Sequence, residues 1–166
     1  MMVIGIDPGL ARTGYGVVRQ DPGGDLIYVA AGVITTPAES PIPDRLLELY
    51  SALTEILSLH RPQSGAVEKL FFQRNVSTAM TVGQARGVAL LALAEASVPV
   101  GEYTPGEIKV AVVGYGGADK RQMQDMVRVL LSMEAPPRPD DVADALAVAI
   151  CHLSAAGFHR RVGEHL

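Results

Sequence analysis

The spacing of apolar residues changes near residue 40, and this change constrains the fold more than any other feature of the sequence. Before it, three apolar segments, at 2–7, 13–19 and 26–35, are separated by short connections that contain Pro-Gly. Segments of this kind with turns between them predict three antiparallel strands. After residue 40, helical spacing alternates with short strand-like segments, which is typical of a sheet with helices packed on it.

The second part of the chain predicts five helices and two strands. The helices are expected at about 44–59, 76–96, 105–113, 119–132 and 139–156, and the strands at 65–68 and 98–102. Asp44 and Asp140 are interpreted as N-caps. Because both strands follow helices, they are expected to lie parallel to their neighbours. The predicted fold class is therefore α/β, with a mixed five-stranded sheet (three strands antiparallel, two parallel) flanked by helices.

Length and composition favour one compact domain. The chain has 166 residues, of which 48% are hydrophobic, enough for a single core and too few for two domains. We expect the domain at 1–156 and a flexible tail at 157–166. The single cysteine, Cys151, excludes an internal disulfide and a cysteine-pair zinc site, and fits a cytoplasmic setting. The N-terminus does not resemble a signal peptide, and no apolar run is long enough to suggest a membrane segment.

Four acidic residues stand where carboxylates are costly. Asp7 ends the first strand and Glu68 ends the fourth, so parallel pairing would bring both to one sheet edge. Asp141 and Asp144 are three apart and share one face of the last helix. Each has an ordinary alternative role: Asp7 in a turn, Glu68 as an exposed acid, Asp141 in an acidic first helical turn. Asp144, which enters an apolar helix, needs a counter-charge.

Metal ions would relieve the repulsion among four converging carboxylates. Their hard oxygen ligands suit Mg²⁺ or Mn²⁺ and not zinc. Two such ions, about 3.5–4 Å apart, can activate a water and stabilise the leaving oxygen in phosphodiester hydrolysis. We therefore expect Mg²⁺ as the cofactor, with Mn²⁺ as a substitute and two ions per active site during catalysis.

The order of motifs resembles the RuvC family of Holliday-junction resolvases, within the RNase H-like superfamily. The matching segments are Gly5-Ile-Asp-Pro-Gly, Thr13-Gly-Tyr-Gly-Val, Val67-Glu68 with Phe71-Phe72 and Asn75, Gly83-Gln-Ala-Arg-Gly, Lys109 to Gly114, and Asp141-Val-Ala-Asp-Ala-Leu-Ala. The resemblance covers residues 2 to about 155. It implies that Asp7, Glu68, Asp141 and Asp144 are metal ligands. It also implies a homodimer that nicks two opposed strands of a four-way DNA junction, leaves 5′-phosphates and works with the RuvA–RuvB branch-migration complex.

DNA contacts are expected in two places. Phe71 and Phe72 lie beside Arg74 and Asn75 just after Glu68, and all four are candidate DNA-binding residues. One phenylalanine is expected to pack under the loop and the other to stack on opened bases, and the resemblance favours Phe71 for the second role. The basic residues Lys109, Lys120 and Arg121 flank Gly114-Tyr-Gly-Gly. They are either ordinary helix-surface charges or phosphate contacts, and the resemblance supports contacts for Lys109 and Lys120.

Two alternative functions have some support in the sequence. Asp7-Pro-Gly and Thr13-Gly are similar to phosphate loops of actin-like ATPases, but the P-loop signature is absent and a second half-domain would not fit this length. Another RNase H-like nuclease, of the YqgF type, is nearer. The net charge of −4 argues against nucleic acid in general, although bound metal ions would offset part of it. Gly83 and Gly87 allow close helix packing, either on the sheet or at a dimer seam.

Overall fold

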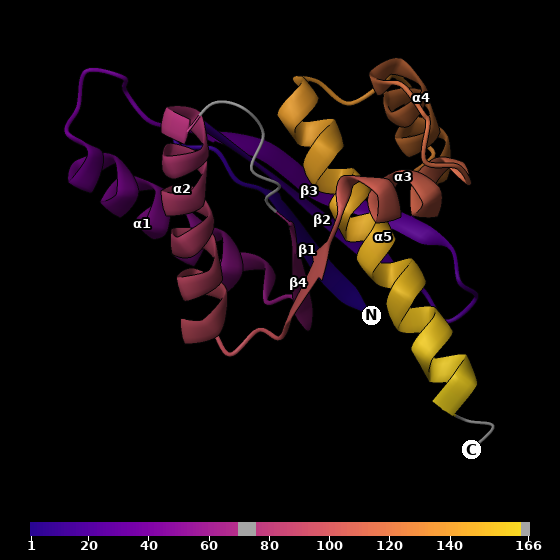
Figure 1. The fold of residues 1–166 in the computed structure, drawn as a ribbon. Coiled ribbons are helices and arrows are strands. Elements are labelled where there is room, and N and C mark those ends of the chain that lie inside the picture. Colours follow the sequence, from indigo (N-terminus) through magenta and orange to yellow (C-terminus); the bar gives the residue numbers. More distant parts are fainter. Residues whose placement is uncertain (70–75, 164–166) are drawn as a thin grey trace.

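Five strands form one sheet between two layers of helices (Figure 1). The computed structural model describes residues 1–69 and 76–163, with side chains described for 1–69 and 79–156. The strands are β1 (Met2–Asp7), β2 (Arg12–Gln20), β3 (Leu26–Thr35), β4 (Ser64–Glu68) and β5 (Val100–Tyr103). The helices are α1 (Ile42–His60), α2 (Val76–Glu95), α3 (Pro105–Val113), α4 (Lys120–Leu130) and α5 (Asp140–Gly163).

The topology confirms the mixed sheet expected from the sequence. The strand order is β3-β2-β1-β4-β5, with β1–β2 and β2–β3 antiparallel and β1–β4 and β4–β5 parallel. The strands that follow helical crossovers are the parallel ones, because a chain that crosses the sheet through a helix re-enters it in the same direction.

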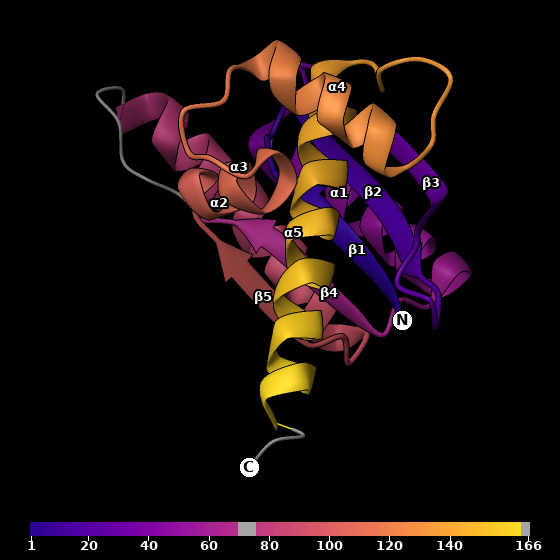
Figure 2. The same ribbon diagram turned by 90° about the vertical axis from the view of Figure 1, so that its right-hand side faces the viewer.

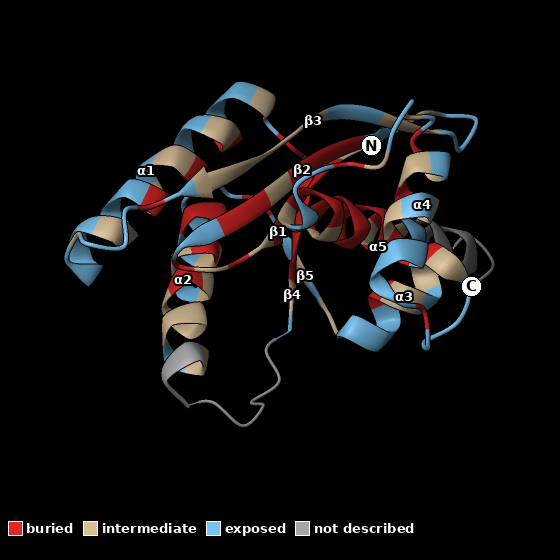
Figure 3. Cartoon of the chain, turned by 90° about the horizontal axis from the view of Figure 1, so that it is seen from above, coloured by how far each residue is buried: buried red, intermediate tan, exposed pale blue. Residues whose placement is uncertain are grey.

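Each face of the sheet has its own hydrophobic core. On one face Ile4, Ile6 and Val17 pack with α1 and α2. On the other face Val3 and Val18 pack with α3, α4 and α5. Figure 2 shows α5 lying over the middle of the sheet, and Figure 3 shows buried residues concentrated in α5 and the central strands. Among the described residues, no helix is long and apolar enough to span a membrane.

Both predicted N-caps are wrong. Helix α1 begins at Ile42 after Pro41, so Asp44 lies inside the first turn and not before it. Pro43 is tolerated in this turn because the first N–H groups of a helix have no partner within the helix. Asp140 is the first residue of α5, and its carboxylate accepts a hydrogen bond from Gln124 at 2.7 Å. Both acids still lie near the positive end of a helix, where a negative charge is favourable.

The end of the last helix also differs from the expectation. The backbone of α5 continues to Gly163, beyond the helix end predicted at residue 156. A glycine inside a helix costs about 1 kcal/mol relative to alanine, which does not by itself end the helix. The assignments of 1–156 to a single domain and of 157–166 to a flexible tail stay predictions.

A partly buried polar network joins α5 to the parallel strands. The His152 ring lies 2.8 Å from the Tyr103 hydroxyl through Nδ1 and 2.9 Å from the Ser64 hydroxyl through Nε2. Burial lowers the pKa of His152, so the folded protein favours the neutral ring. A neutral imidazole has one donor and one acceptor nitrogen, which suits two hydroxyl partners.

We expect His152→Gln to cost roughly 1–3 kcal/mol at pH 7.5, because hydroxyl groups lose partners. The cost should shrink toward pH 5.5. At acid pH the unfolded wild-type chain protonates His152 more readily than the folded chain does. Lowering the pH therefore destabilises the wild type through His152, and this loss is absent from the glutamine variant. Urea unfolding of both proteins at each pH measures the difference, in which contributions from other acids cancel. A difference that is the same at both pH values would contradict the role given to His152.

Candidate active site

Strand alternation places Asp7 and Glu68 on the face of the sheet that α5 covers. Side chains two apart on a strand lie on the same face, so Asp7 shares a face with Val3, which packs against α5. Glu68 likewise shares a face with Ser64, which contacts His152 of α5. Ile6 and Val67 are paired in register, and Asp7 and Glu68 are the next residues of these two strands.

Glycines allow α5 to lie directly on the sheet. A Cβ atom at Gly14 would come within 2.7 Å of the carbonyl carbon of Asp141, and one at Gly5 within 2.5 Å of the amide nitrogen of Ala149. No side chain fits in these gaps, so the backbone of α5 touches β1 and β2. This close approach brings Asp141 and Asp144 to the sheet edge where Asp7 and Glu68 end their strands.

Burial and neighbouring acids raise the pKa of Asp7, Glu68 and Asp144. The pKa of Asp7 is raised from 3.8 to about 7, first by burial and then by Asp144, Glu68 and Asp141, while Lys120 opposes the rise. Burial and Asp144 raise the pKa of Glu68. The pKa of Asp144 is also raised, chiefly by burial, which Lys120 partly offsets. The four predicted acids are therefore close enough to interact, as expected, and folding pays for bringing them together.

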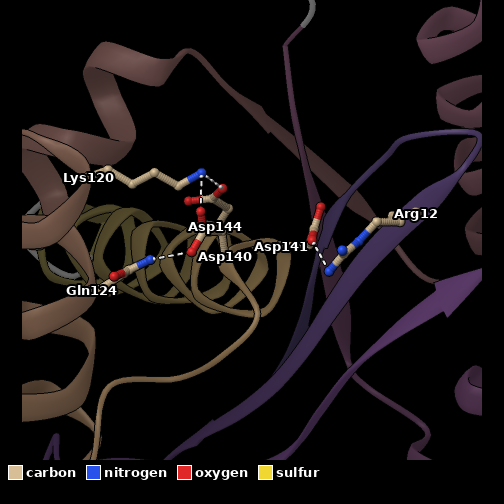
Figure 4. A network of polar contacts seen from close by, with 6 residues as sticks. All are labelled: Arg12, Lys120, Gln124, Asp140, Asp141 and Asp144. Atoms are coloured by element: carbon tan, nitrogen blue, oxygen red, sulfur yellow. Dashed lines mark hydrogen bonds and ion pairs between the residues drawn. The ribbon is translucent and has the colours of Figure 1, made fainter.

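Two basic side chains reach the acids of α5 from opposite sides (Figure 4). Lys120 Nζ lies 2.9 Å from Asp140 Oδ2 and 3.8 Å from Asp144 Oδ2. An Arg12 guanidinium nitrogen lies 2.7 Å from Asp141 Oδ2. Lys120 thus supplies the counter-charge that the sequence predicted for Asp144. Its partners belong to α5 and not to its own helix.

The start of α4 fixes the position of Lys120. Asp119 accepts a hydrogen bond from the Gln122 amide at 2.8 Å, and the Gln122 side chain accepts one from the Asp119 amide at 2.9 Å. This reciprocal capping box makes Lys120 the first residue of α4. A pocket of about 270 Å³ beside it is lined by Lys120, Lys109, Glu68 and Asp144, with apolar residues of α3, α4 and α5. Two predicted phosphate contacts therefore line the same pocket as two predicted metal ligands.

Other predicted DNA contacts have different outcomes. Arg121 is exposed at the start of α4 and does not line the pocket of Lys120. Phe71, Phe72, Arg74 and Asn75 lie outside the described residues, so their roles stay predictions. Among the described residues, no three acidic, histidine or cysteine side chains are close enough together to hold a metal ion as they stand. Asp141 and Asp144 are instead paired with Arg12 and Lys120.

Sequence reasoning missed two arginines at the site. Arg12 is the only basic residue before Arg19, and Arg86 is the only charged residue between Val76 and Ala94. The isolation of each charge was the available signal. Arg86 donates from Nε to the Glu68 backbone carbonyl at 3.3 Å and forms an ion pair with Glu102. It therefore ties the end of β4, where Glu68 lies, to α2.

We expect Arg86→Met to lower the free energy of unfolding by roughly 1–3 kcal/mol, because the Glu68 carbonyl and the Glu102 carboxylate lose a charged donor. The Arg86 side chain is only 19% exposed, so water replaces it poorly. Glu102→Gln is the matched control, since it keeps the Arg86–Glu68 hydrogen bond and removes only the ion pair on the more exposed side. Urea unfolding of the two variants should show a smaller loss for Glu102→Gln. Equal losses would mean that the ion pair, and not the anchoring of Glu68, is the main contribution.

Comparisons with known proteins identify the family. The family model described as "Crossover junction endodeoxyribonuclease RuvC" matches residues 3–152. The RuvC protein of Chloroflexus aggregans is 59% identical over 163 residues, covering 98% of this chain and 99% of that protein. That of Desulfitobacterium hafniense is 50% identical over the full length of both.

Solved structures agree with the sequence comparisons. The structure of Thermus thermophilus RuvC in complex with a Holliday junction substrate has a TM-score of 0.87 and 35% identity, and the match covers 95% of this chain and 96% of that one. The yeast mitochondrial Holliday junction resolvase Ydc2, at 14% identity and a TM-score of 0.68, shares the fold. These matches confirm the RNase H-like fold that the resemblance of the motifs implied. The chain belongs to the RuvC family of crossover junction endodeoxyribonucleases.

Proposed function

We propose that this protein resolves four-way DNA junctions by metal-dependent phosphodiester hydrolysis, with Asp7, Glu68, Asp141 and Asp144 as the metal ligands. The observation that carries the proposal is the placement of four carboxylates at the ends of β1 and β4 and the start of α5. There burial and the three other acids raise the pKa of Asp7 to about 7. Such crowding costs folding stability, and divalent cations would relieve it. Acids with pKa values shifted in this way are typical of catalytic sites.

The donor set fits Mg²⁺, with Mn²⁺ as a substitute, because all four ligands are hard carboxylate oxygens. Bound as a pair during catalysis, the ions would supply a nucleophilic water and charge stabilisation at the cut phosphodiester, leaving 5′-phosphates. The protein's own residues hold the ions and orient the strand. Lys109 and Lys120, which line the pocket of Glu68 and Asp144, are suited to bind backbone phosphates beside the cut.

Further contacts and partners complete the proposal. Arg121, Arg74 and Asn75 would bind the DNA backbone, and Phe71 and Phe72 would contact opened bases or pack beneath them. A homodimer would place two active sites on a junction of matching two-fold symmetry, because one chain carries a single set of carboxylates. The RuvA–RuvB complex is the expected partner, and the cytoplasm the expected location.

The test compares substrates under one set of conditions. In Mg²⁺ the protein should cut a four-way junction with paired nicks on opposed strands, and should cut linear duplex and RNA–DNA hybrid far more slowly. An ATPase assay run alongside tests the actin-like alternative, and preferred cleavage of the hybrid would favour a different RNase H-like nuclease. Cutting that is equal on all three substrates would contradict junction specificity. Single, unpaired nicks would contradict a working dimer.

We expect Lys120→Ala to reduce junction cleavage and to lower the slope of log Kd against log salt by about 0.7–0.9, the value for one lost phosphate contact. Lys120→Arg should retain most of both. Arg19→Ala is the control, since it removes the same charge from an exposed residue. Arg19 lies near the end of β2 that is remote from Asp7. Binding isotherms at several salt concentrations give the slope. If the slope and the cleavage rate stay unchanged, Lys120 serves only to pair with Asp140 and Asp144.

A further inference from the structure

Arg12 contacts Asp141, a proposed metal ligand, and has no role in the proposed hydrolysis so far. It begins β2, immediately after the connection that follows Asp7, and pairs with Asp141 at 2.7 Å (Figure 4). Its side chain is 48% exposed and that of Asp141 is 28% exposed. An ion pair this open to solvent is weak enough for a divalent cation to displace.

Lys120 and Arg12 differ in whether they retain an acidic partner once a metal ion binds the carboxylates. Lys120 contacts both Asp140 and Asp144, so it retains Asp140 if a cation takes Asp144. For Arg12, Asp141 is the one acid within ion-pair distance among the described side chains. A cation that takes Asp141 therefore leaves the Arg12 guanidinium without its acidic partner. Arg12 and a metal ion compete for the same carboxylate.

The surroundings of Arg12 offer the freed guanidinium room for a new partner. Arg12, Arg138, Pro139, Asp140 and Asp141 line a shallow depression that adjoins the active site. Once a metal ion neutralises Asp141, two arginines border this depression. A guanidinium binds phosphate oxygens in a bidentate manner, which a DNA backbone at this edge of the site would satisfy.

We propose that Arg12 is a positioning residue: it holds Asp141 in the metal-free protein, and it transfers to a DNA backbone phosphate when a divalent cation takes Asp141. The inference rests on the proposed function, because it assigns Asp141 to the metal. It has a thermodynamic consequence. Metal binding frees a DNA-binding group, and DNA binding removes a competitor of the metal, so each ligand strengthens the binding of the other.

The first measurement is Mn²⁺ binding without DNA, followed by calorimetry or by the electron paramagnetic resonance of free Mn²⁺. We expect Arg12→Gln to lower the Kd for Mn²⁺ by about 1.5- to fivefold, the range set by a solvent-exposed ion pair. Arg19→Gln, with the same charge change at the opposite end of β2, should leave the Kd unchanged. In an Asp141→Asn background, Arg12→Gln should have no further effect. A wild-type or weaker Mn²⁺ affinity for Arg12→Gln would overturn the competition.

The second measurement is the Kd for an intact four-way junction, in EDTA and in Ca²⁺, which uses the same class of oxygen ligands. Ca²⁺ should increase the junction affinity of the wild-type protein more than that of Arg12→Gln. Equal increases would overturn the transfer of Arg12 to phosphate. Junction cleavage by the wild-type protein in Mg²⁺ is measured in parallel. A protein that binds Mn²⁺ and does not cut would refute the proposed function, whereas the comparison of variants would still decide the role of Arg12.

Discussion

Asp7→Asn is expected to abolish junction cleavage while making the metal-free protein more stable. Asp7 lies where three other carboxylates raise its pKa, so its removal takes away a metal ligand and a source of repulsion together. We expect the cleavage rate in Mg²⁺ to fall by about 10³-fold or more, equivalent to about 4 kcal/mol of activation free energy. Junction binding should persist, because the substitution removes a negative charge from a surface that meets a polyanion.

The stability change depends on pH in a defined direction. The pKa of Asp7 is about 7 in the folded protein against an ordinary value of 3.8. The folded state therefore holds the proton more tightly than the unfolded state. The contribution of Asp7 to stability is therefore greatest below about pH 4 and is lost as the pH rises through 7. Asparagine does not titrate, so at pH 8 in EDTA the variant should be more stable than the wild type, by at most about 4 kcal/mol.

Thermal unfolding in EDTA and in Mg²⁺ checks this prediction together with a cleavage assay. Mg²⁺ should stabilise the wild type more than Asp7→Asn, because a ligand that binds the folded state raises its stability. Asp125→Asn, an exposed acid on α4, is the control for the loss of one negative charge. A variant that cuts at a rate near the wild type would remove Asp7 from the mechanism. A variant that is destabilised in EDTA would contradict the crowding of the four acids.

Gly5→Ala is expected to destabilise the protein by about 3 kcal/mol or more, a large effect for the addition of one methyl group. The new Cβ would lie 2.5 Å from the amide nitrogen of Ala149 and closer still to the carbonyl oxygen of Ala145. Both are backbone atoms of α5, so no side-chain rotation relieves the clash. The central strand and the helix would have to separate, and the cores of both layers meet at that strand.

Gly106→Ala is the matched control for this substitution. Gly106 lies in the first turn of α3 and is exposed, and a Cβ there would meet only the Thr104 hydroxyl oxygen, at 3.9 Å. Alanine at that position should be neutral or stabilising by up to about 1 kcal/mol. Urea unfolding of both variants measures the contrast. Similar stability of the two would mean that α5 can shift away from β1 at little cost, and that its seating does not fix the acids.

Much of the local structure of this protein, and the meeting of two of its acids, can be predicted from the sequence alone. The limits of β1, β3 and α3 follow from apolar spacing and from the Pro and Gly residues beside them, and the structure places them at the residues expected. The parallel strands follow from the helices that precede them. Asp7 and Glu68 were predicted to meet because the ends of neighbouring parallel strands lie at one edge. These inferences need only neighbours in the chain and the geometry of a sheet.

The neutralisation of the site, in contrast, depends on how the helices pack against the sheet. Arg12 and Asp141 are far apart in the sequence, as are Arg86 and Glu68, and no periodicity links them. The assignment of Lys120 to acids of α5, and not to acids of its own helix, likewise depends on how α4 packs. Long, flexible side chains pair with whichever charge the packed elements bring within reach. That choice depends on the close approach of α5 to Gly5 and Gly14, which is a property of the assembled core and not of any segment alone.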